Sequence, residues 1–492
     1  MIGLAVLFPI ILGFVVVHLL LPREKALIVA LLSVGVGYGV FSWMVFFWLL
    51  VAGQASRGIL LAEAAAILAG AVLAYRRRGL PDIRARLQQT RSRRIVSLET
   101  ALILGFILVA GLATARYTLA TKMAPYGSFD AWESYNMKAR FILLSGKDWK
   151  ELFTTLPDPV PDYPLFLPLS VAGVLMSIGK DSLAVPAAIA VLFICATVGL
   201  LLAALGESRS RSQAALAGMV LLGTPFFVHL SFAQYADIPL AFFFLATMAL
   251  LFLHGRRGAY PESTQDRRVP RLQLDQADPR LLIAAGLTAG LSAWVKNEGL
   301  VFFLVVCITY FGFSWHALGR REAIRRARMY LLGGAGPIIL ALLFKLKFAG
   351  TNALVQTQGR AGMLHKLLMP HRYLEVLEGY RYHLYHLASW PESILLLLAV
   401  YAVILGVRVE KRERPALLTW AVTLLIMLGV YFLVLVGSPY DTQPFDVSWY
   451  ILVTAPRLFM QLWPSFLLVF FLTVRTPDEI IAPLKSKAAA SA

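Results

Sequence analysis

Four ionisable residues stand at or near the ends of long hydrophobic segments of this chain: Asp130, Asp237, Lys296 and Arg457. A positioned carboxylate can act as a general base, whereas lysine and arginine are the side chains that bind phosphate. Ionisable residues within apolar segments are costly, which makes them candidates for a functional site. These residue types predict chemistry in which a base works beside a bound phosphate.

Asp130 lies in a polar loop, residues 120–164, between two hydrophobic segments. Apolar residues recur at helical spacing after it, which predicts an amphipathic helix over 131–144 at a membrane interface. Glu133 follows three residues later, as in a capping box, so one interpretation of Asp130 is a helix N-cap. The other interpretation is a carboxylate that faces a cavity and acts as a general base or binds a metal.

Two further carboxylates allow the same pair of interpretations. Asp162 and Tyr163 open a short apolar stretch at Pro164, where Asp162 could cap a helix that has proline in its first turn. Asp237 precedes Pro239 and could also be a cap, but within the membrane it would be costly and would mark a site. Carboxylates at the ends of three different segments favour a shared site more than any one of them does.

The basic residues also have a structural and a functional interpretation. Lys296 is followed by Asn297 and Glu298 between two apolar runs. This is either a tight turn whose side chains reach water or a cation for phosphate beside an acidic neighbour. Arg457 follows Pro456 inside the last apolar segment, where it needs an internal carboxylate or a lipid phosphate as its partner.

The segments that must position these residues are typical of a membrane protein. The 492 residues are 59% hydrophobic and 15% charged, and the mean hydropathy is +0.70, far from the composition of a soluble globular domain. Apolar runs of about 17–23 residues match the thickness of a bilayer, and they do not alternate as the strands of a membrane barrel do. We therefore expect an all-α polytopic membrane protein.

Charge and cysteine usage exclude other classes. The net charge of +18 is explained by basic cytoplasmic loops, so we expect no nucleic-acid partner. Cys195 and Cys307 both lie inside apolar segments and predict neither a disulfide framework nor a metal site. The first apolar segment begins at Ile2 with no basic residue before it, so we expect a span and not a cleaved signal peptide.

About thirteen segments have the length and hydrophobicity of a membrane-spanning helix. They lie at roughly 2–21, 27–51, 58–75, 96–119, 183–205, 213–232, 238–254, 281–295, 299–315, 329–349, 391–407, 416–436 and 451–474. The apolar stretch 164–179 is too short to cross, and we expect a juxtamembrane or re-entrant helix there.

The distribution of basic residues predicts the orientation of the chain. If 164–179 does not cross, one side receives 30 of the 46 Lys and Arg residues, as the positive-inside rule requires. If it crosses, every later basic loop moves to the side opposite the basic loop 75–95. The first solution places the N-terminus outside, the C-terminus in the cytoplasm, and all the polar motifs on the outer face.

The chain divides into three parts on this basis. Residues 1–95 are an N-terminal addition of three spans and a basic loop, 96–349 carry most of the motifs and the outer loop 120–182, and 350–492 hold a second outer loop and the last spans. In the loop 350–390, His383 and His386 resemble metal ligands, but the basic composition favours contact with lipid headgroups.

Residues 96–474 resemble the GT-C superfamily of membrane glycosyltransferases, in the group of aminoarabinose transferases, protein O-mannosyltransferases and RgtA/B/C/D-like lipopolysaccharide-core transferases. The resemblance is carried by Asp130 in the first outer loop, Asp-Tyr-Pro-Leu at 162–165 in place of His-Pro-Pro-Leu, Ala-Asp-Ile-Pro-Leu at 236–240, Lys-Asn-Glu-Gly at 296–299, and Pro456-Arg457. The aspartate at 162 and the three added N-terminal spans depart from the family pattern.

The resemblance implies a sugar transfer from a polyprenyl-phosphate carrier to a glycan, lipid or protein acceptor. It implies that Asp130 is the catalytic aspartate, that Asp237 is the acidic residue of the second outer loop, and that Lys296 and Arg457 hold the donor phosphate. Glu133, Asp162, Tyr163 and Glu298 would support them. The expected location is a bacterial inner membrane, with the site facing the periplasm and a role in the cell envelope.

Three alternatives stay open at this point. A divalent metal, Mg or Mn, could be shared by Asp130 and Asp237, because paired carboxylates suit hard cations. A glycan ligase or polymerase would use the same lipid-linked donors. A transporter or flippase of lipid-linked sugars would instead place charges near the membrane midplane, on helices related by an internal repeat, and we find no such repeat.

Overall fold

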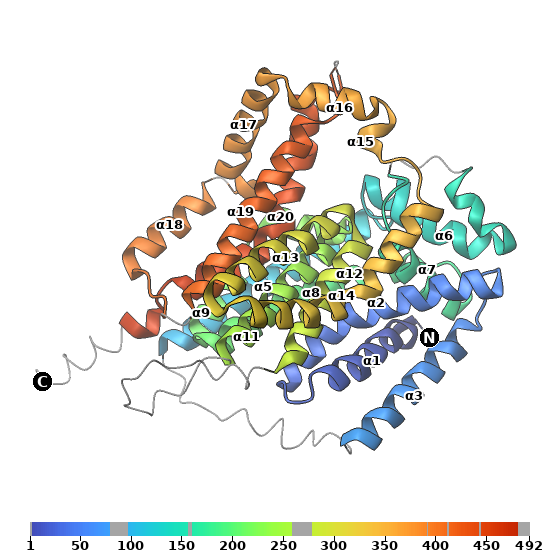
Figure 1. Ribbon diagram of the computed structural model, residues 1–492, viewed down its shortest axis with the longest axis horizontal. Coiled ribbons are helices and arrows are strands. Elements are labelled where there is room, and N and C mark those ends of the chain that lie inside the picture. Colours follow the sequence, from blue (N-terminus) through green and yellow to red (C-terminus); the bar gives the residue numbers. More distant parts are fainter. Residues whose placement is uncertain are drawn as a thin grey trace, which may run out of the picture.

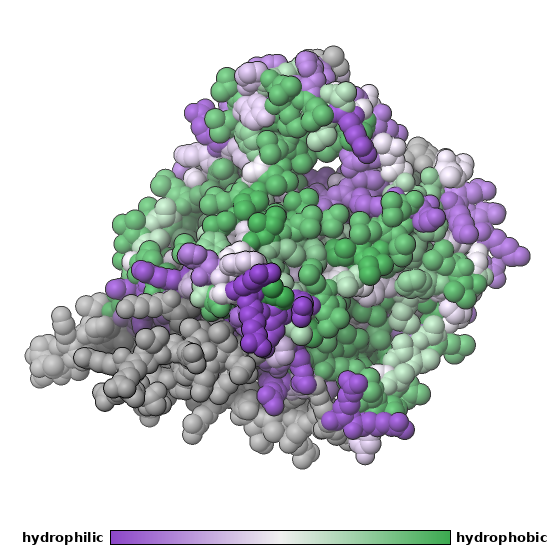
Figure 2. All heavy atoms as spheres, viewed as in Figure 1, coloured by the Kyte–Doolittle hydropathy of each residue, from purple (hydrophilic) through white to green (hydrophobic). Residues whose placement is uncertain are grey.

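The computed structural model describes residues 2–78, 97–155, 160–257, 278–390, 392–410, 413–441 and 444–480. Within these ranges the chain is helical and has no β-strand (Figure 1). Hydrophobic side chains cover the middle of the face shown in Figure 2, and hydrophilic ones gather near α6 (Asn136–Leu144) and at the lower margin. The predicted all-α polytopic membrane fold is confirmed.

In the described part of the chain, ten helices are long and apolar enough to cross a membrane. They are α1 (Ile2–Leu20), α2 (Ala26–Ala52), α3 (Ile59–Arg78), α5 (Ser97–Met123), α8 (Ala184–Ser208), α11 (Asp237–Arg257), α13 (Asn297–Leu318), α14 (Arg320–Lys347), α19 (Arg414–Val436) and α20 (Val447–Thr473). Two of the other predicted segments are the shorter apolar helices α12 (Pro279–Val295) and α18 (Ile394–Leu405).

The predicted span 213–232 is a bent pair of helices. Here α9 (Arg211–Leu222) and α10 (Pro225–Phe232) meet at 65°. Pro225 has no N–H to continue the helical hydrogen bonds of α9. The carbonyl oxygen of Gly223 at the bend accepts a hydrogen bond from the Trp390 indole at 2.8 Å, which supplies a partner for an otherwise orphaned group.

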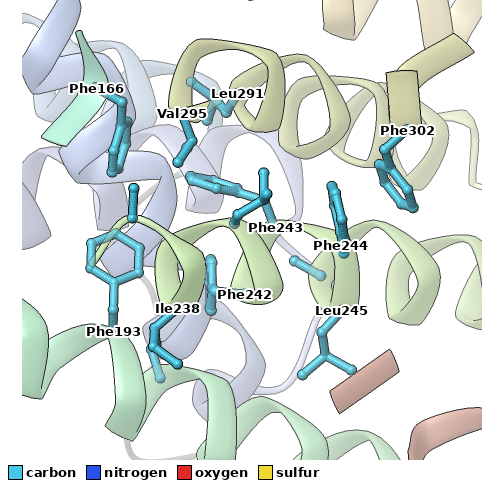
Figure 3. Close-up of a cluster of buried hydrophobic side chains, with 14 of the residues drawn as sticks. Phe166, Phe193, Ile238, Phe242, Phe243, Phe244, Leu245, Leu291, Val295 and Phe302 are labelled. Carbon is cyan, nitrogen blue, oxygen red and sulfur yellow. The ribbon is translucent and has the colours of Figure 1, made fainter. Parts of the chain in front are cut away.

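α11 is the most enclosed of the spanning helices: 94% of its apolar window is buried inside the protein. Its aromatic side chains pack in several directions, as Figure 3 shows for Phe243 beside Phe166 and Phe193. Phe244 stacks on Phe302 of α13 with ring centroids 4.0 Å apart. Stacked and edge-on ring pairs add specific packing energy to this hydrophobic core.

α12 and α14 approach each other so closely that glycine is required between them. A Cβ atom at Gly286 of α12 would lie 1.9 Å from the carbonyl oxygen of Tyr330. Small residues allow such backbone contact between membrane helices. The N-terminal helices are also packed tightly onto this part: the Trp294 indole of α12 donates to the Ser42 hydroxyl of α2 at 3.0 Å.

Short helices form the two long loops that the basic residues predict to lie on the outer face. The first loop contains a π-helical turn, η1 (Ala131–Tyr135), then α6, a 3₁₀ segment η2 (Gly146–Phe153), and α7 (Phe166–Ile178). The second contains α15 (Ala353–Gln356), α16 (Gly359–Leu367), α17 (Pro370–Tyr385) and η4 (Leu387–Ser389), and α15–α17 arch over the helices at the top of Figure 1.

The expectations for the first loop hold in outline and differ in detail. The helix expected over 131–144 is present as η1 and α6. The stretch 164–179 forms α7, whose 13 residues span only about 20 Å at 1.5 Å each, too short to cross. All 13 are buried, so α7 lies inside the protein and not at its lipid surface.

Candidate active site at one end of the helices

The structure brings Asp130, Asp237, Lys296 and Arg457 together from four separate elements. The Nη2 atom of Arg457 lies 2.7 Å from Asp130 Oδ2 and 2.9 Å from Asp237 Oδ2. The Nζ atom of Lys296 lies 3.2 Å from the other oxygen of Asp237. These four residues, here called the Arg457 cluster, form one connected set of ion pairs.

Asp237 is the centre of the Arg457 cluster. It is the first residue of α11 and has no exposed side-chain surface. Besides Lys296 and Arg457, it accepts a hydrogen bond from Gln461 Nε2 at 2.6 Å. Three donors supply the compensation that a buried carboxylate needs, so Asp237 is held in one place and does not serve as a helix cap.

Lys296 is placed by a sharp break between α12 and α13. Its backbone is extended, with φ −152° and ψ 164°, and the chain turns back at once because Gly299 has no side chain. A Cβ atom at Gly299 would lie 1.9 Å from the carbonyl oxygen of Ser292. The Lys296 side chain points inward and is buried, so it does not reach water.

Two carboxylates keep Lys296 charged. Burial alone lowers the pKa of an ammonium group, but Asp237 and Glu298 outweigh burial and raise the pKa of Lys296 above its ordinary value. Glu298 contributes directly, with its Oε1 atom 3.1 Å from Nζ. Lys296 is therefore a permanent cation at neutral pH.

Asp130 does not cap the helix that follows it. Its backbone is already helical, and its side chain makes no capping hydrogen bond, which contradicts the N-cap interpretation. The carboxylate turns instead to Arg457. Glu133 is half-buried on η1 and forms no capping box with Asp130. The π-helical geometry of η1 is itself uncommon and occurs frequently at functional sites.

Two tyrosines lie against the cations. The Tyr235 ring is 4.5 Å from the Arg457 guanidinium carbon, and its hydroxyl accepts a weak hydrogen bond from the Asp130 N–H at 3.4 Å. The Tyr163 ring is 5.3 Å from Lys296 Nζ. Both are cation–π contacts. Burial raises the pKa of Tyr163 well above its ordinary value, so this phenol stays neutral.

Asp162 belongs to a second polar cluster beside the first. It is buried and does not cap α7, whose N-cap position is Leu165. Its carboxylate accepts hydrogen bonds from Asn297 at 2.6 Å and from Asn352 at 2.7 Å, and Lys345 Nζ lies 3.5 Å away. Asp162 thus ties the first outer loop to the Lys296 turn and to the start of α15.

Sequence reasoning missed Gln461 and Tyr235. Gln461 lies four residues after Arg457, so both side chains emerge on one face of α20. It also accepts a hydrogen bond from the Tyr431 hydroxyl at 2.8 Å. A polar amide one turn after an arginine in an apolar segment was the available signal for Gln461. Tyr235 gave no signal because a tyrosine at a helix end has many ordinary roles.

The arrangement does not suit a metal shared by Asp130 and Asp237. One guanidinium nitrogen of Arg457 already bridges the two carboxylates. Within the described ranges, no group of three or more His, Cys, Asp or Glu residues could hold a metal ion. His383 and His386 therefore belong to no such group. The side chains present fit an anionic ligand better than a cation.

A cavity of about 330 Å³ lies between α6, α7 and the start of α8. Its wall is mostly apolar and includes Trp132, Asn136 and Val171. At its rim, Arg140 and Asp181 form an ion pair of 2.6 Å. None of the four residues of the Arg457 cluster lines this cavity.

The loops predicted to be cytoplasmic also meet one another. Arg209 pairs with Glu413 at 2.6 Å, and Arg256 lies 4.0 Å from the same carboxylate. Arg408 pairs with Glu479 at 2.8 Å. The loops that the charge count assigned to one side therefore contact one another, and the Arg457 cluster joins loops assigned to the other.

Apolar helices with a buried set of ion pairs at one end define an integral membrane protein with a charged site. Residues 178–354, a little over a third of the chain, match the family model described as dolichyl-phosphate-mannose-protein mannosyltransferase. That family is part of the GT-C superfamily of membrane glycosyltransferases, so the matched segment is similar to this superfamily. No curated protein and no solved structure matches the chain.

The matched segment carries half of the Arg457 cluster. Asp237 and Lys296 lie inside residues 178–354, whereas Asp130 precedes the segment and Arg457 follows it. The family name describes a lipid-phosphate-linked sugar as donor. The resemblance to GT-C glycosyltransferases that the sequence predicted is confirmed, and the assignment of individual residues to roles stays a prediction.

Proposed function

We propose that this protein transfers a sugar from a polyprenyl-phosphate carrier to a hydroxyl group of a glycan, lipid or protein acceptor. The observation that carries the proposal is the contact between Asp130 and Arg457 beside Lys296. A carboxylate for the acceptor and two cations for a phosphate thus lie within one connected site. The membrane-embedded helices around it suit a donor with a long hydrocarbon chain.

The reaction is an inverting transfer. The acceptor oxygen attacks the anomeric carbon of the donor sugar, and the bond from that carbon to the phosphate oxygen breaks. Asp130 receives the acceptor proton as general base. Lys296 and Arg457 stabilise the charge on the departing polyprenyl phosphate. The products are the glycosylated acceptor and the polyprenyl phosphate.

Asp237 and Gln461 would act by holding the cations. Asp237 contacts both Lys296 and Arg457, and Gln461 fixes Asp237 from the same face of α20. Their arrangement keeps two positive groups at a defined separation before the donor arrives. Cationic side chains that already point to the place where negative charge develops stabilise it effectively, because they need no reorganisation during the reaction.

The positions of the charges support transfer over transport. Asp237 is the first residue of α11, and Lys296 lies between α12 and α13. These charges stand at helix ends, whereas a secondary transporter builds its site near the midplane. The basic loops favour a site on the outer face, which we assign to the periplasmic side of a bacterial inner membrane.

A transfer assay tests the proposal. The purified protein is incubated with a panel of polyprenyl-phosphate sugars, including the mannosyl compound, and with extracts of glycolipids, polysaccharides and proteins. Mass analysis should detect one sugar added to one acceptor class, together with free polyprenyl phosphate. Turnover with a nucleotide sugar and none with any lipid-linked donor would overturn the proposal.

A further inference from the structure

The cations of the Arg457 cluster are already neutralised by the protein itself. Lys296 and Arg457 carry two positive charges, and three carboxylates contact them directly: Asp130 and Asp237 on Arg457, and Asp237 and Glu298 on Lys296. A donor phosphate, which the proposed function requires, brings at least one further negative charge. Its entry therefore needs one of the resident carboxylates to leave a cation.

The two carboxylates that contact Arg457 are held very differently. Asp237 has no exposed side-chain surface and accepts from Lys296, Arg457 and Gln461. The side chain of Asp130 is 29% exposed, and among the described contacts its carboxylate has one donor, Arg457. Of these two, Asp130 is therefore the carboxylate that can leave Arg457, and Asp237 is the one that stays.

Arg457 can exchange one partner while its other contacts keep the guanidinium in place. The Tyr235 ring lies against the guanidinium face at 4.5 Å, and Asp237 holds Nη2 at 2.9 Å. The Nε atom of Arg457 is buried and has no hydrogen-bond partner among the described residues. The guanidinium thus stays oriented and has an unused donor, and phosphate oxygens bind such donors in pairs.

We propose that the donor phosphate displaces Asp130 from Arg457, so that binding of the lipid-linked donor itself releases the catalytic base. Without donor, the carboxylate is occupied by the guanidinium. With donor bound, the phosphate takes that place and the freed carboxylate, still near the phosphate, accepts a proton from the acceptor hydroxyl. The reaction is then ordered, with donor binding before the base becomes available.

The exchange predicts an unusual binding result. Asp130→Asn removes the competitor for Arg457, so the variant should bind polyprenyl phosphate more tightly than the wild type while losing transfer. We expect a gain of about five- to tenfold in affinity, measured by titration calorimetry with the full-length protein in detergent. Equal or weaker binding by Asp130→Asn overturns the exchange.

Asp181→Asn is a matched control. Asp181 also pairs with an arginine, Arg140, at 2.6 Å, and its side chain is 30% exposed. The substitution removes one negative charge from a similar ion pair outside the Arg457 cluster. If it tightens binding as much as Asp130→Asn does, the gain reflects general charge and the exchange is wrong. Unchanged affinity supports the exchange.

Two further probes separate failure of the exchange from failure of the proposed function. A polyprenol of the same length, which has no phosphate, should bind wild type and Asp130→Asn equally. If neither protein binds polyprenyl phosphate, the proposed function fails with the exchange. If wild type binds it and Asp130→Asn gains nothing, only the exchange fails. Asp130→Ser repeats the test should the asparagine variant not fold.

Discussion

Arg457 and Arg209 are two half-buried arginines that pair with carboxylates at opposite ends of the helices. Arg209 lies in the turn between α8 and α9, and its three side-chain nitrogens all donate to protein groups: Glu413 and the carbonyl oxygens of Ser208 and Leu472. Arg457 contacts both Asp130 and Asp237 through Nη2, and its Nε is buried without a hydrogen-bond partner among the described residues. One arginine is saturated by the protein and the other is not.

The difference separates a structural ion pair from a site. Arg209 joins the junction of α8 and α9 to the start of α19 and the end of α20, so its contacts hold helix ends together. Arg457 contacts a fixed carboxylate, Asp237, and an exposed one, Asp130. An arginine with an unused donor beside a partly exposed carboxylate is available to a ligand, and a saturated arginine is not.

The largest expected effect is the loss of transfer when Asp130, a carboxylate of the Arg457 cluster, is replaced. Asp130→Asn should lower the transfer rate by about 10²–10⁴-fold, because the amide cannot accept the acceptor proton. The variant keeps the size and shape of the side chain, so its melting temperature should stay near that of the wild type. Rates are measured by mass detection of the product from purified protein.

The control for this prediction is Asp181→Asn, which changes a carboxylate of equal exposure outside the cluster. Its rate should lie within about twofold of the wild type, since exposed ion pairs contribute only about 0–1 kcal/mol. Wild-type turnover by Asp130→Asn would remove Asp130 from the role of base.

The arginines themselves give the second comparison. Arg457→Gln should lower the transfer rate by about 10²–10³-fold, the usual cost of losing one donor to a developing negative charge. Arg457→Lys keeps the charge but loses the planar paired donors, so it should recover part of that loss. Turnover that is insensitive to both variants would show that Arg457 pairs with Asp237 for structure alone.

Arg209→Gln should show the opposite pattern. Glu413 is 2% exposed, and removal of Arg209 leaves this buried charge with only the distant Arg256, 4.0 Å away, which costs up to about 3 kcal/mol. We expect a clear drop in the melting temperature in detergent and an unchanged transfer rate per folded molecule. A selective loss of transfer, with the melting temperature intact, would break the distinction between the two arginines.

Much of this contrast could be predicted from the sequence, and the reason is energetic. A charge such as Arg457 inside an apolar segment needs a partner, and charge counting predicted on which side of the membrane that partner would lie. The spacing of Asp130 and Glu133 wrongly suggested a helix N-cap, because a capping pattern reports only on contacts between residues close in sequence. The competing contact with Arg457 comes from more than 300 residues away.

Other features had no local signature. Asp162 is held by Asn297 and Asn352, and amides in loops are too common for sequence reasoning to select these two. The bend between α9 and α10 was visible only as Pro225, which fits the start of a new helix as well as a kink. Long-range packing decided both cases.

The smallest expected effect concerns pH. Asp237 and Glu298 hold the pKa of Lys296 above its ordinary value of 10.5, against the effect of burial. Because the pKa is higher in the folded protein, the stabilisation from this pair is fully present below about pH 10.5 and is lost only as the pH rises through the folded value. Between about pH 6 and pH 10, Lys296 should therefore add no pH dependence to melting or transfer.

Lys296→Arg makes this prediction sharp, because arginine stays protonated over the whole range. Wild type and variant should show the same shape of rate against pH up to about pH 10, even if their absolute rates differ. An alkaline decline near about pH 9 in the wild type, absent in Lys296→Arg, would mean that Lys296 loses its proton easily. Asp237 and Glu298 would then not compensate the burial of Lys296. Lys296 would differ in this from Arg209 and Arg457, whose positive charges are held by neighbouring carboxylates.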